Sequence, residues 1–124
     1  MKSKILVVDD DETIQMVLLD FLTKKGYEVR TACHGQQALL LIDAESFLPD
    51  IVVTDVAMAV LDGIGLARQL RMRNIVTEII FMSGGIGAHT EAELREYSPH
   101  YIAKPFSLAA LADIIEQLLH AGVH

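Results

Sequence analysis

The chain has very little cysteine. Cys33 is the one cysteine among 124 residues, so no disulfide can form within the chain. Small extracellular domains commonly depend on disulfides, and we therefore expect a reducing, cytoplasmic compartment. We expect the Cys33 thiol to be buried and inert, because a catalytic thiol needs a base and an orienting group around it.

Long apolar runs and clustered basic residues are also missing. The apolar stretch near the start, Ile5 to Val8, ends in three aspartates, so we expect neither a signal peptide nor a membrane-spanning helix of roughly 18 apolar residues. The formal net charge is −7 at pH 7, and no stripe of lysine and arginine accompanies it. We therefore expect no direct nucleic-acid binding and no membrane insertion.

The chain does contain short apolar runs that alternate with amphipathic segments. Its hydrophobic fraction is 52%, which suits a compact core, and its length suits a single domain over residues 1–124. Alternation of this kind predicts repeated βα units. We expect an α/β fold in which five such units, joined by right-handed crossovers, form a doubly wound parallel sheet.

Periodicity and capping residues place the individual elements. Strands are expected near residues 5–8, 28–31, 51–53, 78–82 and 101–103. The first helix should end at Gly26 and bury Ile14, Val17, Leu18, Phe21 and Leu22. Later helices should be capped by Asp62, by a capping box at Thr90 before a short helix from about Glu91, and by Ser107.

Four of the apolar runs end at a functional group. These groups are the aspartates Asp9, Asp10 and Asp11, then Asp55, Ser83 and Lys104. The carboxyl ends of parallel strands share one edge of a sheet, so acids, a hydroxyl and an amine should converge there. This cluster needs strand one beside strand three, and the flavodoxin-like order 2-1-3-4-5 provides that arrangement.

Such a group suits a divalent cation and a phosphoryl group. Asp55 is the best nucleophile, because it is a lone acid in an apolar stretch, although a satisfied structural aspartate would give the same pattern. Asp9 and Asp10 could hold Mg²⁺, which accepts a few carboxylate oxygens and keeps several waters. The aspartates could instead cap the first helix, a role we expect for Asp11 or Glu12.

A hydroxyl and an amine would complete this site. Ser83 and Lys104 could contact the phosphoryl oxygens that a metal does not hold, although neither residue is diagnostic by itself. We interpret all five histidines as solvated, with His34, His89 and His100 in loops and with His120 and His124 ending the chain beyond the last helix turn.

With these motifs the chain resembles the receiver domains of two-component response regulators. The resemblance covers essentially all 124 residues and is carried by four segments in order: Val7 to Asp11, Asp55 to Met58 with Leu61-Asp62-Gly63, Met82-Ser83-Gly84, and Tyr101 to Phe106. Each segment is weak alone, but their order and spacing are specific. One departure is Ala59, where the family often has proline.

The resemblance implies a role for each matching residue. Asp55 would accept a phosphoryl group from a phosphohistidine and, with Asp10 and the backbone carbonyl of Ala57, would ligate Mg²⁺. Asp9 would act through a bound water. Lys104 and Ser83 would contact the phosphoryl group, and the domain would assist its own phosphorylation and dephosphorylation. Ser83 and Tyr101 would form the switch.

The resemblance also implies partners. The donor would be a sensor histidine kinase or a phosphotransfer protein, docking near Ile14 and Gln15. The face of the fourth helix, fifth strand and fifth helix would bind a downstream effector protein or domain, or a second copy after phosphorylation.

Other functions share parts of this pattern. A haloacid-dehalogenase phosphohydrolase needs a second aspartate two residues after the nucleophile, where this chain has Ala57. A flavin carrier needs a phosphate loop after strand one, where three aspartates would repel the flavin phosphate. An unphosphorylated adaptor of the same fold and the receiver portion of a hybrid histidine kinase stay open.

Overall fold

The computed structural model describes residues 2–84 and 91–121, which form alternating strands and helices. The strands are β1 (Lys4–Val8), β2 (Glu28–Ala32), β3 (Ile51–Asp55), β4 (Glu78–Ser83) and β5 (His100–Ala103). The helices are α1 (Glu12–Lys24), α2 (Gly35–Glu45), α3 (Gly63–Met72), α4 (Glu91–Tyr97) and α5 (Leu108–Ala121). The predicted succession of five βα units is therefore confirmed.

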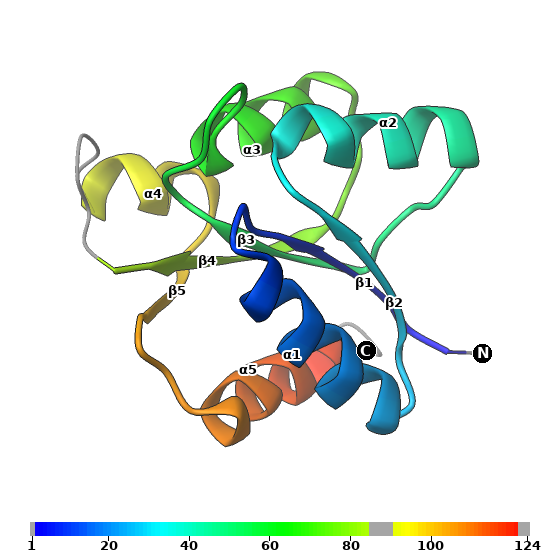
Figure 1. The fold of residues 1–124 in the computed structure, drawn as a ribbon. Coiled ribbons are helices and arrows are strands. Elements are labelled where there is room, and N and C mark those ends of the chain that lie inside the picture. Colours follow the sequence, from blue (N-terminus) through cyan, green and yellow to red (C-terminus); the bar gives the residue numbers. More distant parts are fainter. Residues whose placement is uncertain (1, 85–90, 122–124) are drawn as a thin grey trace.

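The strands form one parallel sheet between two layers of helices. Their order is β2-β1-β3-β4-β5, as predicted, so β2 and β5 are the edge strands. Helices α1 and α5 cover one face, and α2 and α3 cover the other, with α4 beside α3 (Figure 1). The chain reverses its direction of travel across the sheet between β1 and β3, which is where such folds place their sites.

Each face of the sheet contributes to its own hydrophobic core. In β1, Ile5 and Val7 pack with α1 and α5, whereas Leu6 and Val8 pack with α2 and α3. Successive side chains of a strand point to opposite faces, so a strand covered on both sides is apolar throughout. Within the described residues, no helix combines the length and the apolar character needed to cross a bilayer.

Three helices are capped at their N-termini by the side chains that the sequence predicts. The Asp11 carboxylate accepts hydrogen bonds from the N–H groups of Thr13 and Ile14 at the start of α1. Asp62 caps α3 and Ser107 caps α5 in the same way. These bonds satisfy N–H groups that have no partner inside the helix. The predicted capping box at Thr90 lies outside the described residues, although α4 begins at Glu91 as expected.

The turn between β2 and α2 differs from prediction. His34, expected as a solvated loop residue, caps α2, because its Nδ1 accepts a hydrogen bond of 3.1 Å from the Gln37 N–H. Cys33, expected to be buried, is a free cysteine that is only partly buried. Its own N–H donates to the Gln37 side-chain oxygen. Local hydrogen bonds of this turn, which hydrophobic periodicity does not report, explain both differences.

Three further positions differ from prediction. Val17, expected to face the core from α1, has 45% of its surface exposed, because it lies at the edge of the apolar stripe. Leu18 and Leu22 are the fully buried residues of that stripe. His100 is the first residue of β5 rather than part of a loop, and its Nε2 lies 3.7 Å from Oε2 of Glu78. His120, expected beyond the last helix turn, lies in the last turn of α5, because this helix continues to Ala121.

The loop between β3 and α3 contains a backbone conformation that its residue disfavours. Val60 has a φ of 69° and is 77% exposed, so neighbouring side chains do little to hold this conformation. A β-branched residue in this left-handed region is sterically unfavourable, whereas glycine adopts it readily.

We therefore expect Val60→Gly to increase the free energy of unfolding by roughly 0.5–1.5 kcal/mol, because relief of strain exceeds the entropy cost of glycine. Urea denaturation measures this change. The matched control is Val76→Gly, since Val76 is 98% exposed and is not among the residues with positive φ. The control should lose stability or leave it unchanged, and equal responses of the two variants would contradict the prediction.

Candidate functional site

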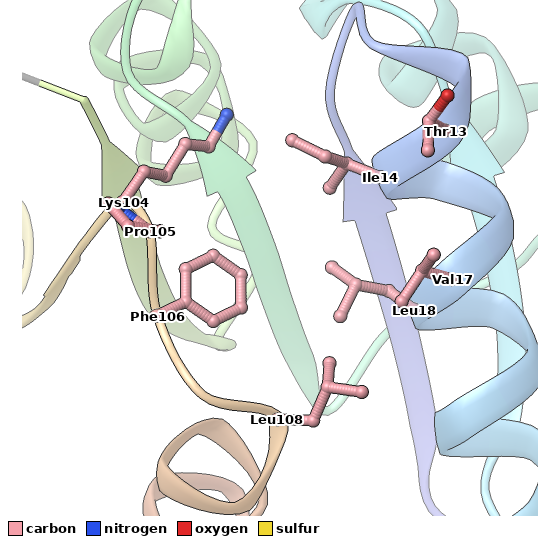
Figure 2. A pocket seen from close by; sticks show the side chains of 8 residues that line it. All are labelled: Thr13, Ile14, Val17, Leu18, Lys104, Pro105, Phe106 and Leu108. Carbon is pink, nitrogen blue, oxygen red and sulfur yellow. The ribbon is translucent and has the colours of Figure 1, made fainter.

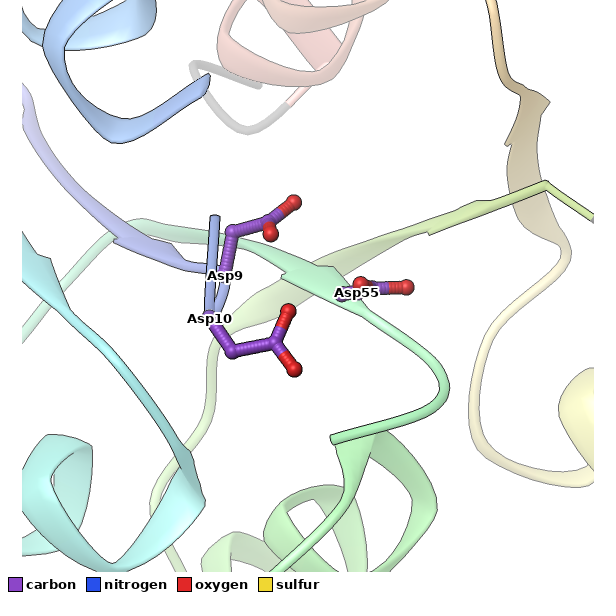
Figure 3. A group of neighbouring side chains, drawn as sticks. All are labelled: Asp9, Asp10 and Asp55. Carbon is purple, nitrogen blue, oxygen red and sulfur yellow. The ribbon is translucent and has the colours of Figure 1, made fainter. Parts of the chain in front are cut away.

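Three aspartates lie together at the carboxyl edge of the sheet. Asp9 and Asp10 follow β1, and Asp55 is the last residue of β3. One carboxylate oxygen from each residue lies within 4.8 Å of the others (Figure 3). Three negative charges this close repel one another unless a positive charge is present. The arrangement can hold a cation.

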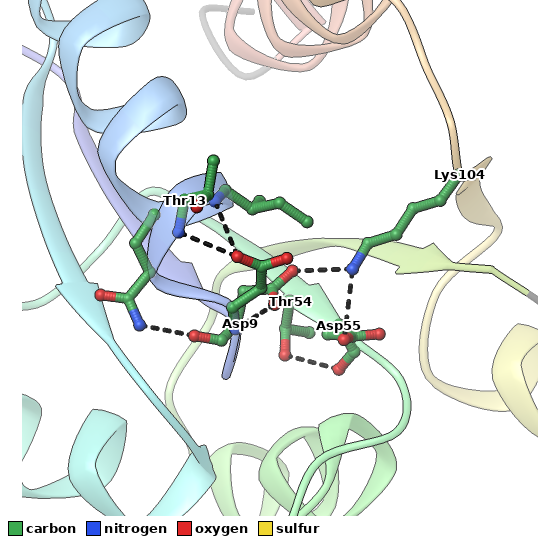
Figure 4. A network of polar contacts seen from close by, with 8 residues as sticks. Asp9, Thr13, Thr54, Asp55 and Lys104 are labelled. Atoms are coloured by element: carbon green, nitrogen blue, oxygen red, sulfur yellow. Dashed lines mark hydrogen bonds and ion pairs between the residues drawn. The ribbon is translucent and has the colours of Figure 1, made fainter.

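Asp9 is completely buried and held through both its backbone and its side chain (Figure 4). Its N–H donates to the Ala32 carbonyl at 3.0 Å, and its own carbonyl accepts from Nε2 of Gln15 at 2.6 Å. Oδ1 accepts the Asp11 N–H at 2.8 Å, and Oδ2 accepts Nζ of Lys104 at 2.9 Å. The Asp9 carboxylate therefore has little freedom to move.

Asp10 is different, because its side chain is exposed. Its carboxylate accepts no hydrogen bond and makes no ion pair within residues 2–84 and 91–121, yet one of its oxygens belongs to the acidic group. Figure 3 shows the Asp9 carboxylate on the side of α1 and the Asp10 carboxylate on the side of α3. Asp10 is thus the acid with oxygens available to a ligand from solvent.

Asp55 and Lys104 influence each other's ionisation. Burial raises the pKa of Asp55, and the carboxylates of Asp9 and Asp10 raise it further, against the opposing effect of the Lys104 charge. Nζ of Lys104 lies 3.3 Å from Oδ2 of Asp55. Partial burial disfavours the charged Lys104, but its hydrogen bond to Asp9 and the two negative charges outweigh this, so its pKa lies above the ordinary value. The amine is therefore a stable cation between two acids.

The end of β3 is anchored to the start of α3. The Gly63 N–H donates to the Val56 carbonyl at 2.9 Å, and the Thr54 hydroxyl donates to the Asp55 carbonyl at the same distance. A β-carbon at Gly63 would lie 2.4 Å from the Asp55 carbonyl oxygen, which no real contact permits. Glycine is required there because the helix begins directly against the strand.

The remaining predicted residues lie at the same edge or next to it. Ser83 is the last residue of β4, is 2% exposed and pairs in register with Ala103 of β5. Ala57 lies exposed in the loop after β3. Tyr101, in β5, is partly buried and packs against the core on the side of α2, α3 and α4.

An apolar groove borders the acidic group. It has a volume of about 460 Å³ and lies between α1 and the segment after β5 (Figure 2). Its lining consists of Thr13, Ile14, Val17, Leu18, Lys104, Pro105, Phe106 and Leu108. Figure 2 shows the apolar side chains of the two segments facing each other across the groove. Lys104 therefore belongs to both the groove and the acidic site.

Sequence reasoning missed the contacts that hold the acids in place. Gln15 was expected only near a docking face, and Thr54 was not identified. A glutamine in the first turn of the helix, six residues after the strand-end Asp9, could have signalled the first contact, because its side chain can reach back to the strand. The contact of Gly63 with Asp55 depends on the packing of α3, and no pattern in the sequence indicates it.

Comparison with known proteins places the chain among signalling proteins. A family model described as "Response regulator receiver domain" matches residues 5–116. The "Probable transcriptional regulator ycf27" of Cyanophora paradoxa is 39% identical over 118 residues, which cover 95% of this chain and 48% of that protein. The "Alkaline phosphatase synthesis transcriptional regulatory protein PhoP" of Bacillus subtilis (strain 168) is 37% identical over 108 residues, 86% of this chain and 44% of that protein. The chain therefore spans about half the length of these curated relatives.

Solved structures share the fold. A response regulator receiver domain from Clostridium thermocellum superposes with a TM-score of 0.85 at 26% identity, covering 97% of this chain and 96% of that one. The receiver domain of the Francisella response regulator 1452 superposes with a TM-score of 0.80 at 34% identity, covering 98% and 99%. The flavodoxin-like architecture predicted from the sequence is thus confirmed.

The raised pKa of Asp55 leads to a prediction about stability. The folded state holds this proton more tightly than the unfolded chain, so the free energy of unfolding falls as pH rises from the ordinary aspartate pKa of about 3.9 to the raised value. At pH values above the raised pKa, the destabilisation that ionised Asp55 causes is fully present. In the absence of metal, Asp55→Asn should therefore unfold at a higher temperature than the parent at pH 7.

Thermal unfolding monitored by circular dichroism between pH 3.5 and 8 measures this effect. The advantage of Asp55→Asn should shrink as the pH approaches 3.5, where the parent carboxyl is protonated in both states. The control is Asp113→Asn, because Asp113 is exposed on α5. A parent more stable than Asp55→Asn at pH 7 would show that the Lys104 ion pair outweighs burial and repulsion.

Proposed function

Because the chain belongs to the response regulator receiver domain family, we propose that it receives a phosphoryl group on Asp55. The observation that carries this proposal is the amine of Lys104 beside Asp55 and Asp9, with the exposed Asp10 close by. Phosphoryl transfer to a carboxylate needs a nucleophile, a cation and donors for the phosphoryl oxygens. We propose that residues 1–124 act as a single receiver domain.

The donor is a phosphohistidine of a sensor histidine kinase or phosphotransfer protein. An Asp55 carboxylate oxygen attacks phosphorus, an O–P bond forms, and the N–P bond to the donor imidazole breaks. The product is an acyl phosphate, and the released imidazole takes up a proton. Asp55 is suited to this step because it is 9% exposed, so few waters compete with the incoming group for its oxygens.

A magnesium ion fits the acidic group. Carboxylate and carbonyl oxygens are the ligands that Mg²⁺ accepts, and Asp10 has oxygens free for this purpose among the described residues. Asp10, Asp55 and the backbone carbonyl of Ala57 would hold the ion, with Asp9 acting through a bound water. When bound, Mg²⁺ neutralises the acids and the phosphoryl oxygens. Asp9 keeps its hydrogen bond to Lys104, which orients the amine.

Lys104 and Ser83 serve the phosphoryl oxygens that the ion does not contact. The N–H of Lys104 donates to the Ser83 carbonyl at 2.7 Å, so the two residues are linked through the backbone. Through these contacts the domain assists both its phosphorylation and its dephosphorylation. Tyr101 is the switch residue with Ser83, and it borders a hollow that is also lined by Leu94 of α4. The signal passes to the face formed by α4, β5 and α5.

That face binds the output partner. Two curated relatives are named as transcriptional regulators and are about twice as long as the matched region. A downstream effector, either a further domain or a separate protein, is therefore the partner of this face, and a phosphorylated homodimer can use the same surface. The domain works in the cytoplasm, with kinase and effector.

Labelling with acetyl phosphate tests the proposal. In the presence of Mg²⁺ the chain should gain one phosphoryl group, seen as one added phosphate in the intact mass. Asp55→Asn should lose at least 95% of this incorporation, because its amide is not a nucleophile. The matched control is Asp11→Asn, which removes a nearby acid but keeps a good helix cap.

An unlabelled parent chain would favour the adaptor that works without phosphorylation. Equal labelling of the parent and Asp55→Asn would place the phosphoryl group on another residue. Labelling that proceeds equally well when a chelator removes Mg²⁺ before acetyl phosphate is added would contradict the role of the acidic group in holding the ion.

The apolar groove is where we expect the donor protein to dock. Val17 is half-exposed in its lining, and Lys104 belongs to both the groove and the site, so a partner seated there is brought beside Asp55. The donor for the test is the phosphorylated sensor kinase that transfers fastest to the parent chain among a panel of such kinases. With this donor, Val17→Asp should slow phosphotransfer about tenfold or more, because a charge in the groove disfavours an apolar partner surface. Labelling by acetyl phosphate should stay within twofold of the parent, because this small donor needs no groove.

The control for this test is Leu40→Asp, since Leu40 is 57% exposed on α2 and is not part of the groove. Stopped-flow or quenched-flow transfer rates provide the measurement. Equal slowing by Val17→Asp and Leu40→Asp would contradict a specific role for the groove.

A further inference from the structure

We infer that Gln15 is a positioning residue for the metal site, and that it acts on Asp10 by fixing the peptide bond between Asp9 and Asp10. This inference rests on the proposed function and concerns how the same site is organised. Nε2 of Gln15 donates to the Asp9 carbonyl at 2.6 Å. That carbonyl belongs to the peptide that joins Asp9 to Asp10. The hydrogen bond therefore restrains the orientation of the peptide plane that precedes the Cα atom of Asp10.

Asp10 depends on such a restraint more than its neighbours do. The side chain of Asp9 is held by Lys104 and by the Asp11 N–H, and the side chain of Asp11 caps α1. Within the described residues, the Asp10 carboxylate has no hydrogen bond of its own. The backbone therefore fixes the point from which the Asp10 side chain starts, and Gln15 is the side chain that holds the preceding carbonyl.

The chemistry of glutamine suits this task. Its amide donates a hydrogen bond but adds no positive charge, so it does not compete with a cation for the acids. Its side chain is partly buried, which makes the bond less accessible to water than one on the surface. A preorganised ligand binds a metal more tightly, because less conformational freedom is lost on binding.

Gln15 and its neighbour Ile14 have separate roles. Ile14 lines the apolar groove, whereas Gln15 is not part of that lining and reaches toward the end of β1. Both lie in the first turns of α1, so two adjacent residues of this helix serve different features, the groove and the acids. A change at Gln15 should consequently alter metal binding without changing the groove.

The test compares Mn²⁺ binding by the parent, Gln15→Met and Met16→Leu. Methionine has nearly the length and helix propensity of glutamine but cannot donate, and Met16 is a 69% exposed neighbour that serves as the control. Electron paramagnetic resonance of free Mn²⁺ gives the dissociation constants. We expect Gln15→Met to raise the constant about 3- to 10-fold and Met16→Leu to leave it within 1.5-fold.

A second measurement separates positioning from a purely structural role. In the absence of metal, the backbone order parameter of Asp10, from ¹⁵N relaxation, should fall in Gln15→Met, while those of residues 16–24 of α1 stay unchanged. A structural role alone would lower the urea midpoint without altering the ratio of Mn²⁺ dissociation constants. A ratio below 1.5 between Gln15→Met and the parent overturns the inference.

Mn²⁺ binding and labelling of the parent protein distinguish a failure of this inference from a failure of the proposed function. If the parent binds no Mn²⁺ and takes no label from acetyl phosphate, the proposed function fails and the inference falls with it. If the parent binds Mn²⁺ and is labelled, but Gln15→Met binds Mn²⁺ equally well, the inference alone fails.

Discussion

The ion pairs of Lys104 with Asp9 and Asp55 are the interaction on which the rest of the site depends. Three carboxylates share one edge of the sheet, and two of them are almost fully buried. Without a cation, burial and mutual repulsion would force some of them to take up protons. The amine lies 2.9 Å from one acid and 3.3 Å from the other, so its positive charge opposes the effect of burial and repulsion on the pKa of Asp55.

This ion pair also divides the site into a closed side and an open side. Asp9 is saturated with internal partners on the side of α1, and it therefore orients Lys104 rather than an incoming ligand. Asp10, on the side of α3, is exposed to solvent, and its oxygens have no partner among residues 2–84 and 91–121. Asp9 is thus bound within the protein and Asp10 is exposed to solvent, whereas the largely buried Asp55 contacts the same lysine as Asp9. A site built in this way can be stable while it is still open to ligands.

Much of this arrangement could be predicted, because strong local signals report it. Apolar runs that stop at Asp9, Asp55, Ser83 and Lys104 identify the strand ends, and the need to bring those ends together gives the strand order. Helix caps such as Asp62 follow from local chemistry as well. Buried strands have few alternatives once their hydrophobic runs are recognised.

What could not be predicted depends on distances between elements. The Gln15 amide meets a carbonyl because α1 turns back along β1, and Gly63 is needed because α3 begins directly against Asp55. His34 caps α2 although histidine is an unusual residue at that position. Val17 lies at the boundary between core and solvent, where an apolar residue can be either buried or exposed. Periodicity finds faces but does not measure such contacts.

The location of β5 at the border of the sheet has a mechanical consequence. Every residue of β3 is buried between two neighbouring strands, whereas no residue of β5 is fully buried and, in the part of the chain that the structure describes, one side of this strand has no neighbouring strand. Asp55 is thus mounted on a strand that is held from both sides, whereas Lys104 follows a strand that is held from one side. Because β5 pairs with β4 alone among the described strands and β3 pairs with both β1 and β4, displacing Lys104 disturbs fewer strand contacts than displacing Asp55.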